Sequence, residues 1–205
     1  MQSPLFPGGT YHIFNRAMPD ELLFRCGDNY RFFLSKYLKY IAPISRTYAF
    51  CLMPNHFHFA LKIKSKIELR DIFYPKEKDD FLKEDIDFSL KIDLRFSNFY
   101  NSYAKAYNKM YNRSGKLFLP SHKKRNVSSV VYLRNLIQYI HYNPVHHGFV
   151  SDPYDWTFSS VVEYQKAEQI LIDKPSIQNL FSTELDYIEK PKVENIKNLF
   201  LDLEY

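Results

Sequence analysis

The pattern of apolar and polar positions divides the chain into alternating strand-like and helix-like segments. Segments rich in β-branched and aromatic residues predict strands at residues 9–17, 46–53, 56–63 and 116–127. Segments with apolar residues every three or four positions predict helices at residues 28–41, 90–112 and 129–142. The predicted order is therefore β-α-β-β-α-β, followed by one more helix.

Residues at the segment boundaries favour the same division. Asp28 is expected to cap the first helix, and Ser128 or Ser129 the last one. The last helix is expected to end near Asn143-Pro144, because the residue before a proline disfavours helical geometry. The charged segment 64–87 is expected to be a long surface connection with at most a short helix.

This order predicts an α+β fold of the ferredoxin-like, split β-α-β type. Such a fold has a four-stranded antiparallel sheet with helices on one face. The fourth strand is expected at an edge of the sheet, because Pro120 and the basic residues after it would hinder pairing with a further strand. We expect one domain over residues 1–165 and a C-terminal extension over residues 166–205, which carries no motif. The fold serves many functions and assigns none by itself.

Composition narrows the classes of protein. With 205 residues and 45% hydrophobic content, the chain is long enough to bury a core. No apolar run reaches the roughly 18 residues that cross a bilayer, and no signal-peptide pattern opens the chain. We therefore expect a cytoplasmic protein without a membrane partner. Cys26 and Cys51 form neither a disulfide framework nor a zinc-finger spacing.

The stretch "LMPNHFHFALKI" carries the first candidate chemistry. His56 and His58 are two residues apart on a predicted strand, so both side chains leave the same face, and Phe57 faces the core. Two imidazoles on one face are either ordinary half-buried histidines or two ligands of one metal ion.

A third ligand is expected from the last predicted helix. Tyr139 and Asn143 lie one helical turn apart, so a phenol and an amide oxygen could both face the histidine pair. Asn143 could equally cap the helix. Two imidazoles and an amide would hold Mg²⁺ or Mn²⁺ weakly until a phosphate completes the site. A small zinc hydrolase is the alternative if His12 or Asp28 approaches the pair.

A net charge of +5 is compatible with nucleic-acid binding without requiring it. Lys123, Lys124 and Arg125 are concentrated in the fourth predicted strand, where they either contact phosphates or form a solvated edge. Arg16, with Asn15, either contacts DNA or closes the first strand.

Several motifs together resemble the HUH single-tyrosine transposases, in particular the REP-associated tyrosine transposases. The motifs are "MPNHFHFALK", "YIHYNPVHHGFV" and "DWTFSS". In addition, "YHIFNRA" and "GKLFLPSHKKRNV" are similar to the first strand and the basic strand of that family. The resemblance runs in the same order from Thr10 to Ser160. The histidine pair alone is not specific, but its combination with the tyrosine, the asparagine and Trp156 is.

The resemblance implies that the helix after strand four is catalytic. Tyr139 would be the nucleophile, and His56, His58 and Asn143 would bind Mg²⁺ or Mn²⁺. The tyrosine would attack single-stranded DNA, giving a 5′-phosphotyrosine and a free 3′-OH. The 3′-OH of a second strand would then reverse the step and join new DNA ends. The implied partner is single-stranded or hairpin DNA, and the protein would act as a monomer or a homodimer.

Two functions stay open on these grounds. The first is the DNA strand transferase, for which Tyr132 and Tyr142 are the other possible nucleophiles. The second is a catalytically idle module that still binds single-stranded or hairpin DNA. His146 and His147 differ from the basic and small residues that relatives often carry there, which leaves the choice of substrate open.

Overall fold

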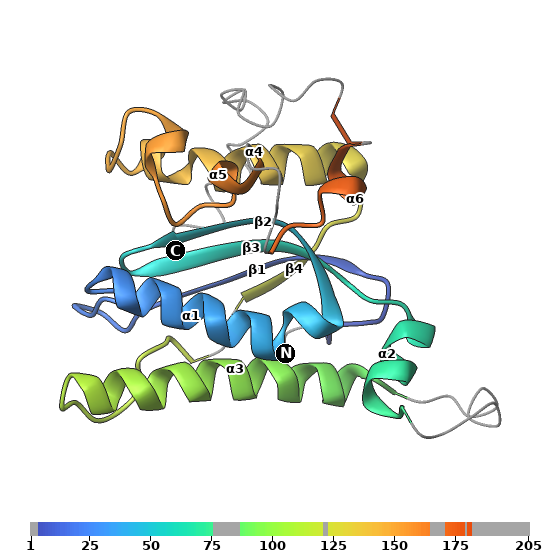
Figure 1. The fold of residues 1–205 in the computed structure, drawn as a ribbon, viewed down its shortest axis with the longest axis horizontal. Helices are drawn as coiled ribbons and strands as arrows, with labels where there is room; N and C mark the ends of the chain where they lie inside the picture. The colour runs from blue at the N-terminus through green and yellow to red at the C-terminus, as the bar shows by residue number, and fades with distance from the viewer. Residues whose placement is uncertain (1–3, 76–86, 121–122, 165–170, 179, 182–205) are drawn as a thin grey trace.

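A computed structural model describes residues 4–75, 87–120, 123–164, 171–178 and 180–181. Its centre is a four-stranded antiparallel sheet with the order β2-β3-β1-β4 (Figure 1). The strands are β1 (Thr10–Arg16), β2 (Ser45–Met53), β3 (His56–Ile63) and β4 (Lys123–Asn126). The predicted α+β fold with its split β-α-β order is confirmed, and β4 lies at an edge as expected.

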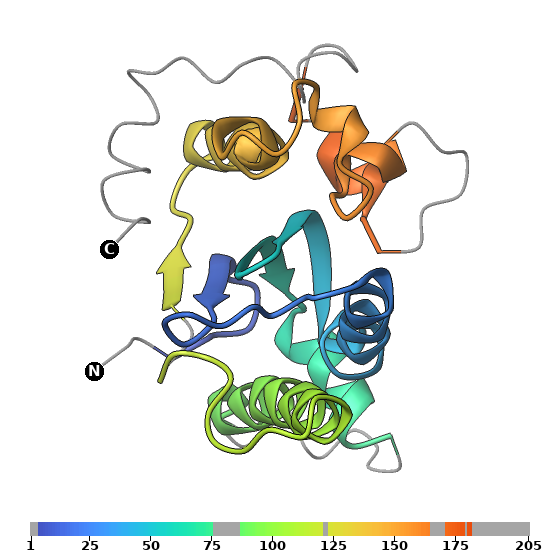
Figure 2. The same ribbon diagram turned by 90° about the vertical axis from the view of Figure 1, so that its left-hand side faces the viewer.

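Helices lie on both faces of the sheet (Figures 1 and 2). The principal ones are α1 (Gly27–Tyr40), α3 (Ser89–Met110) and α4 (Val130–His146). The shorter helices are α2 (Lys66–Phe73), α5 (Val161–Tyr164) and α6 (Lys174–Gln178). The expectation of helices on one face holds for α1 and α3, whereas α4 covers the opposite face. In the described part of the chain, no helix is long and apolar enough to span a membrane.

Aromatic side chains fill the core between the sheet and the α1–α3 layer. Phe33 and Tyr37 of α1 are fully buried there, and Tyr37 stacks on Phe59 of β3 with ring centroids 4.3 Å apart. Phe57 contacts the same core, as the alternation of β3 predicts. This leaves the other side chains of β3, including both histidines, to face α4.

The core between the sheet and α4 is built from smaller strand residues. Ala49 and Ala60 lie under the apolar face of α4, which contributes Leu136 and Ile140. Small side chains let a helix approach a sheet closely. Ile172 packs in the same core and bridges to β2. Most of the predicted C-terminal extension, residues 166–205, lies outside the described residues.

The segment that carries "DWTFSS" covers the free edge of β2. The Trp156 indole donates a hydrogen bond to the Leu52 carbonyl at 2.9 Å. The backbone N–H of Leu52 in turn donates to the carbonyl of Phe158 at 3.0 Å. These bonds satisfy backbone groups that an exposed edge would leave unpaired.

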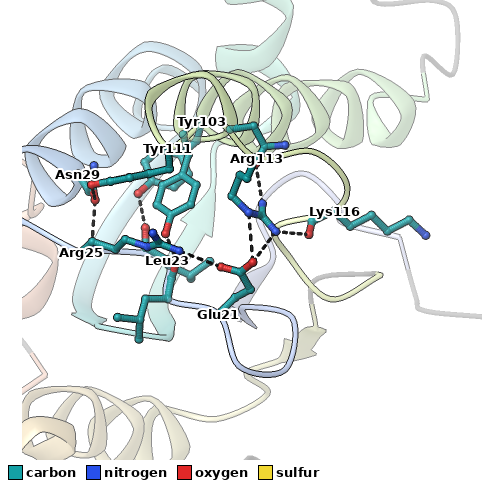
Figure 3. Close-up of polar contacts among 11 residues, drawn as sticks. Glu21, Leu23, Arg25, Asn29, Tyr103, Tyr111, Arg113 and Lys116 are labelled. Carbon is teal, nitrogen blue, oxygen red and sulfur yellow. Dashed lines mark hydrogen bonds and ion pairs between the residues drawn. The ribbon is translucent and has the colours of Figure 1, made fainter.

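The connection between β1 and α1 supports the hairpin turn that precedes the histidine pair. Backbone N–H groups of Leu23 and Phe24 donate to the Pro54 carbonyl at 2.8 and 3.0 Å. The same connection is tied to α3 and to the residues that follow it: Tyr103 of α3 donates a hydrogen bond to the Leu23 carbonyl, and Arg113, beyond the end of α3, pairs with Glu21 at 2.8 Å (Figure 3). The connection therefore links the turn to α3.

Three predicted boundaries were wrong. Helix α1 begins after Cys26 as its N-cap, and Asp28 lies in the first turn, where its carboxylate accepts from Arg31. Strand β4 is shorter than residues 116–127. Before it, the described residues pair with the end of β1 through a bridge between Phe118 and Ala17 and a hydrogen bond from the Leu119 N–H to the Arg16 carbonyl. Residues 121–122, which the prediction included in this strand, are not among those described.

The third correction concerns the end of α4. Ser129 is the N-cap, with its hydroxyl accepting from the Tyr132 N–H, but the helix continues through Pro144 to His146. Proline removes a single backbone donor. Near a helix end this loss is small, and the last turn is closed by the N–H of His147 donating to Asn143 at 3.1 Å. Tyr139 and Asn143 therefore lie on one uninterrupted helix.

Candidate active site

The histidine pair of β3 faces α4. In the sheet register, His56 is opposite Arg16 and His58 is opposite Phe14. His58 is buried and His56 is half-buried. The two rings meet edge to face, with centroids 5.2 Å apart. Both histidines are thus directed to one place, beneath the last long helix.

Helix α4 brings Tyr139 and Asn143 to the same place. The Tyr139 ring meets His58 edge to face, with centroids 5.5 Å apart. Oδ1 of Asn143 lies 3.1 Å from Nε2 of His56, and both helix residues are buried. His141, between them in sequence, faces elsewhere, with Nε2 2.8 Å from the Ser160 hydroxyl. The four residues predicted to act together are therefore neighbours.

His12 joins this cluster, although the sequence placed it only as a residue that could approach. It lies on β1 and is completely buried, with Nε2 3.0 Å from Nδ1 of His58. The signal in the sequence was a histidine in a predicted strand. The missing information was the register between β1 and β3, which decides which side chains are neighbours. His147 also lies close, with its ring centroid 5.1 Å from that of His56.

Burial keeps these imidazoles neutral. Desolvation, aided by the nearby Arg125, lowers the pKa of His12 to about 3. Desolvation also lowers the pKa of His56 to about 4, despite the opposing effect of its contact with the Asn143 side-chain oxygen. The pKa of His58 is held well below its usual range by desolvation and by its histidine neighbours. At neutral pH each ring therefore carries one lone pair, the form that binds metal ions.

These lowered pKa values predict a steep loss of stability in mild acid. The unfolded chain takes up protons below the ordinary histidine pKa of 6.5, while the folded chain resists until about pH 4 for His56 and about pH 3 for His12. Each such histidine removes about 1.4 kcal/mol of stability per pH unit within this window. Three together would remove up to about 4 kcal/mol per unit, a large part of a typical total of about 5–15 kcal/mol.

Urea unfolding in EDTA at pH 7, 6 and 5 measures this loss. Stability is expected to be complete above pH 6.5 and to fall with each step below it. A His12→Phe variant cannot take up one of the protons, so its slope should be roughly a third smaller. A stability that stays level between pH 7 and pH 5 would contradict the burial of neutral histidines.

The donor atoms fit a divalent cation that prefers oxygen and nitrogen. Nδ1 of His56 lies 2.7 Å from Oδ1 of Asn55, an oxygen that can accept the ring proton there. Nε2 then directs a lone pair at the Asn143 oxygen, 3.1 Å away. That lone pair and the amide oxygen would together be available to hold a cation. His56 and Asn143 would hold such an ion through these two atoms, which are 3.1 Å apart.

Of the two residues named for the zinc alternative, His12 approaches the pair, with Nε2 3.0 Å from Nδ1 of His58, and Asp28 does not. Among the residues that the structure describes, no three histidine, cysteine, aspartate or glutamate side chains are grouped so that they could hold a metal ion. Asp28 belongs to α1, on the other side of the sheet, and pairs with Arg31 at 2.7 Å. A cation at the histidine pair would therefore depend on the Asn143 oxygen and on donors supplied from outside, such as a phosphate.

The predicted DNA-binding residues separate onto two faces. Lys123 and Arg125 pair with Phe14 and His12 across the β1–β4 ladder, so they share the histidine face. The charged group of each lies 5.8 Å from the Phe14 ring centroid. Arg16 is exposed at the end of β1, opposite His56.

Lys124 is the exception among these basic residues. It points to the α3 side and pairs with Asp93 at 2.7 Å. There it lines an open pocket of about 700 Å³ between α3 and residues 115–119. Of the four basic residues predicted to contact DNA, Lys124 alone is separated from the histidine pair by the sheet.

A strand with two histidines beneath a helix with a tyrosine and an asparagine thus lies at the centre of an α+β fold. No protein-family model matches the sequence, and no curated protein matches it either. Among solved structures, the fold is similar to that of a REP-associated tyrosine transposase bound to a REP hairpin. The TM-score is 0.58 at 17% identity, and the match covers 88% of this chain and 87% of that chain. At this identity the match shows a shared fold.

Proposed function

We propose that this protein is a metal-dependent DNA strand transferase that cleaves and rejoins single-stranded DNA through a 5′-phosphotyrosine. The observation that carries the proposal is the convergence of α4 on β3. Tyr139 meets the His58 ring, while Asn143 reaches His56 at 3.1 Å. The shared fold with a tyrosine transposase that was solved with a DNA hairpin supports single-stranded or hairpin DNA as the partner.

In the proposed reaction, the Tyr139 oxygen attacks a backbone phosphorus and loses its proton. The bond from phosphorus to the 3′ oxygen breaks, and that oxygen takes up a proton to become a free 3′-OH. The 5′ phosphate is left esterified to the tyrosine. A second 3′-OH then attacks the ester, restoring the tyrosine and joining a new pair of DNA ends. The phosphodiester energy is conserved, so no nucleotide cofactor is required.

The other residues have supporting roles in this proposal. His56, His58 and Asn143 would hold Mg²⁺ or Mn²⁺, which supplies positive charge against the phosphate oxygens. Lys123, Arg125 and Arg16 would contact the backbone on either side of the attacked phosphate. In this proposal the four central side chains act within one chain, as a monomer or as each subunit of a homodimer.

A cleavage assay tests the function directly. The full chain would be mixed with an end-labelled single-stranded hairpin from the DNA that flanks its own gene, with Mg²⁺ or Mn²⁺. Strand cleavage is expected with either metal and should fall by at least about 100-fold when EDTA removes it. Tight binding of the hairpin without cleavage under all metal conditions would instead favour the idle DNA-binding module.

A further inference from the structure

His12 and His58 form a pair of buried imidazoles joined by one short contact. Nε2 of His12 lies 3.0 Å from Nδ1 of His58, and both residues are almost completely buried. The ring planes are 24° apart, with centroids separated by 5.2 Å. Phe14 stacks on His12 with centroids 4.5 Å apart. The packing therefore leaves neither ring free to turn without displacing a neighbour.

A single proton can lie between the two facing nitrogens. A neutral imidazole has one N–H group and one lone pair, so in this 3.0 Å contact one ring donates and the other accepts. If His12 donated, the proton of His58 would have to lie on Nε2, and His58 would have no lone pair for a metal ion. If His58 donates from Nδ1, its Nε2 carries the lone pair that a ligand needs.

We propose that His12 is a positioning residue of the metal site, which accepts the Nδ1–H of His58 and thereby leaves Nε2 of His58 as the ligand atom. The inference rests on the metal site of the proposed function. Metal-bound histidines commonly donate their second N–H to a carboxylate or a carbonyl. Here a neutral imidazole fills that place, so orientation is supplied without adding a charge to an already uncharged donor set.

The geometry separates this role from two others. If His12 were itself a ligand through Nε2, that lone pair could not accept the Nδ1–H of His58, 3.0 Å away. If His12 served in packing alone, any ring of similar shape would replace it. The other nitrogen, Nδ1, is buried and has no hydrogen-bond partner among the residues described. Among the described residues, His12 therefore makes its side-chain hydrogen bond with His58.

Two substitutions distinguish these roles. His12→Phe keeps a ring against Phe14 but removes the acceptor, whereas His12→Gln places an amide oxygen near the former Nε2. Binding of Mn²⁺ alone to the full chain would be followed by electron paramagnetic resonance of the free ion. His12→Phe is expected to weaken Mn²⁺ binding by about 10- to 100-fold, and His12→Gln to restore most of the affinity.

His141→Phe is the matched control, because His141 is equally buried and also bonds a side chain, Ser160, but faces away from the site. It should bind Mn²⁺ like the original protein even if it is less stable. In the Mg²⁺-loaded original protein, ¹⁵N NMR should place the His58 proton on Nδ1.

Unchanged affinity in His12→Phe, or equal losses in His12→Phe and His12→Gln, would overturn the inference while leaving the proposed function standing. A His58 proton on Nε2 in the Mg²⁺-loaded protein would overturn it as well. If the original protein binds no Mn²⁺, the metal site of the proposed function is wrong, and this inference falls with it.

Discussion

Replacing Tyr139 with phenylalanine is expected to lower the rate of strand cleavage by at least about a thousandfold, as loss of a catalytic nucleophile does in other enzymes. The substitution removes one oxygen and keeps the ring that packs between α4 and His58. The fold and the binding of DNA should therefore persist. Gel assays of cleavage and of hairpin binding on the same preparation measure both.

Tyr142→Phe is the matched control for this prediction. Tyr142 is on the same helix and is half-buried. Among the described residues, the tyrosine ring that meets His12 and His58 is that of Tyr139. Its substitution should leave cleavage within a small factor of the original rate. Cleavage that survives in Tyr139→Phe and disappears in Tyr142→Phe would move the nucleophile to the second tyrosine.

His56→Ala is expected to remove measurable Mg²⁺ or Mn²⁺ binding and to slow cleavage by more than about 100-fold. The loss should exceed that of a supporting residue, because a direct ligand disappears and the Asn143 oxygen loses its counterpart at 3.1 Å. Mn²⁺ titration and cleavage rates over a range of Mn²⁺ concentrations measure the two effects. High Mn²⁺ should restore part of the rate if the substitution acts through metal affinity.

His146→Ala is the corresponding control. His146 is exposed at the end of α4, and its described ring contact is with His147, at 5.3 Å, and not with the pair. It should keep both metal binding and cleavage. If His56→Ala cleaved as fast as this control at every Mn²⁺ concentration, the metal role of the histidine pair would be excluded.

The sequence predicted those parts of the fold that depend on local periodicity. The bounds of β3 follow from its alternation, and the common face of Tyr139 and Asn143 follows from their spacing of one turn. The end of α4 was wrong because the rule for residues before proline is a local preference. Packing of the helix against β2 and β3 outweighs it here.

The parts that the sequence did not predict depend on pairing between distant segments. His12 becomes a neighbour of His58 through the register of β1 on β3, which no local pattern encodes. Lys124 looked equivalent to Lys123 and Arg125, yet the alternation of β4 turns it to Asp93 on the α3 side. A strand of four residues is too short for its phase to be read from its own sequence.

The most direct test of the central claim is to trap and map the covalent DNA adduct. The full chain would be incubated with labelled hairpin DNA and Mn²⁺, separated on a denaturing gel, digested with trypsin and fragmented by mass spectrometry. The account predicts a metal-dependent adduct on the peptide of residues 135–166, with the nucleotide on Tyr139. An adduct on Tyr132 or Tyr142, or cleavage that proceeds with no protein–DNA bond, would contradict it.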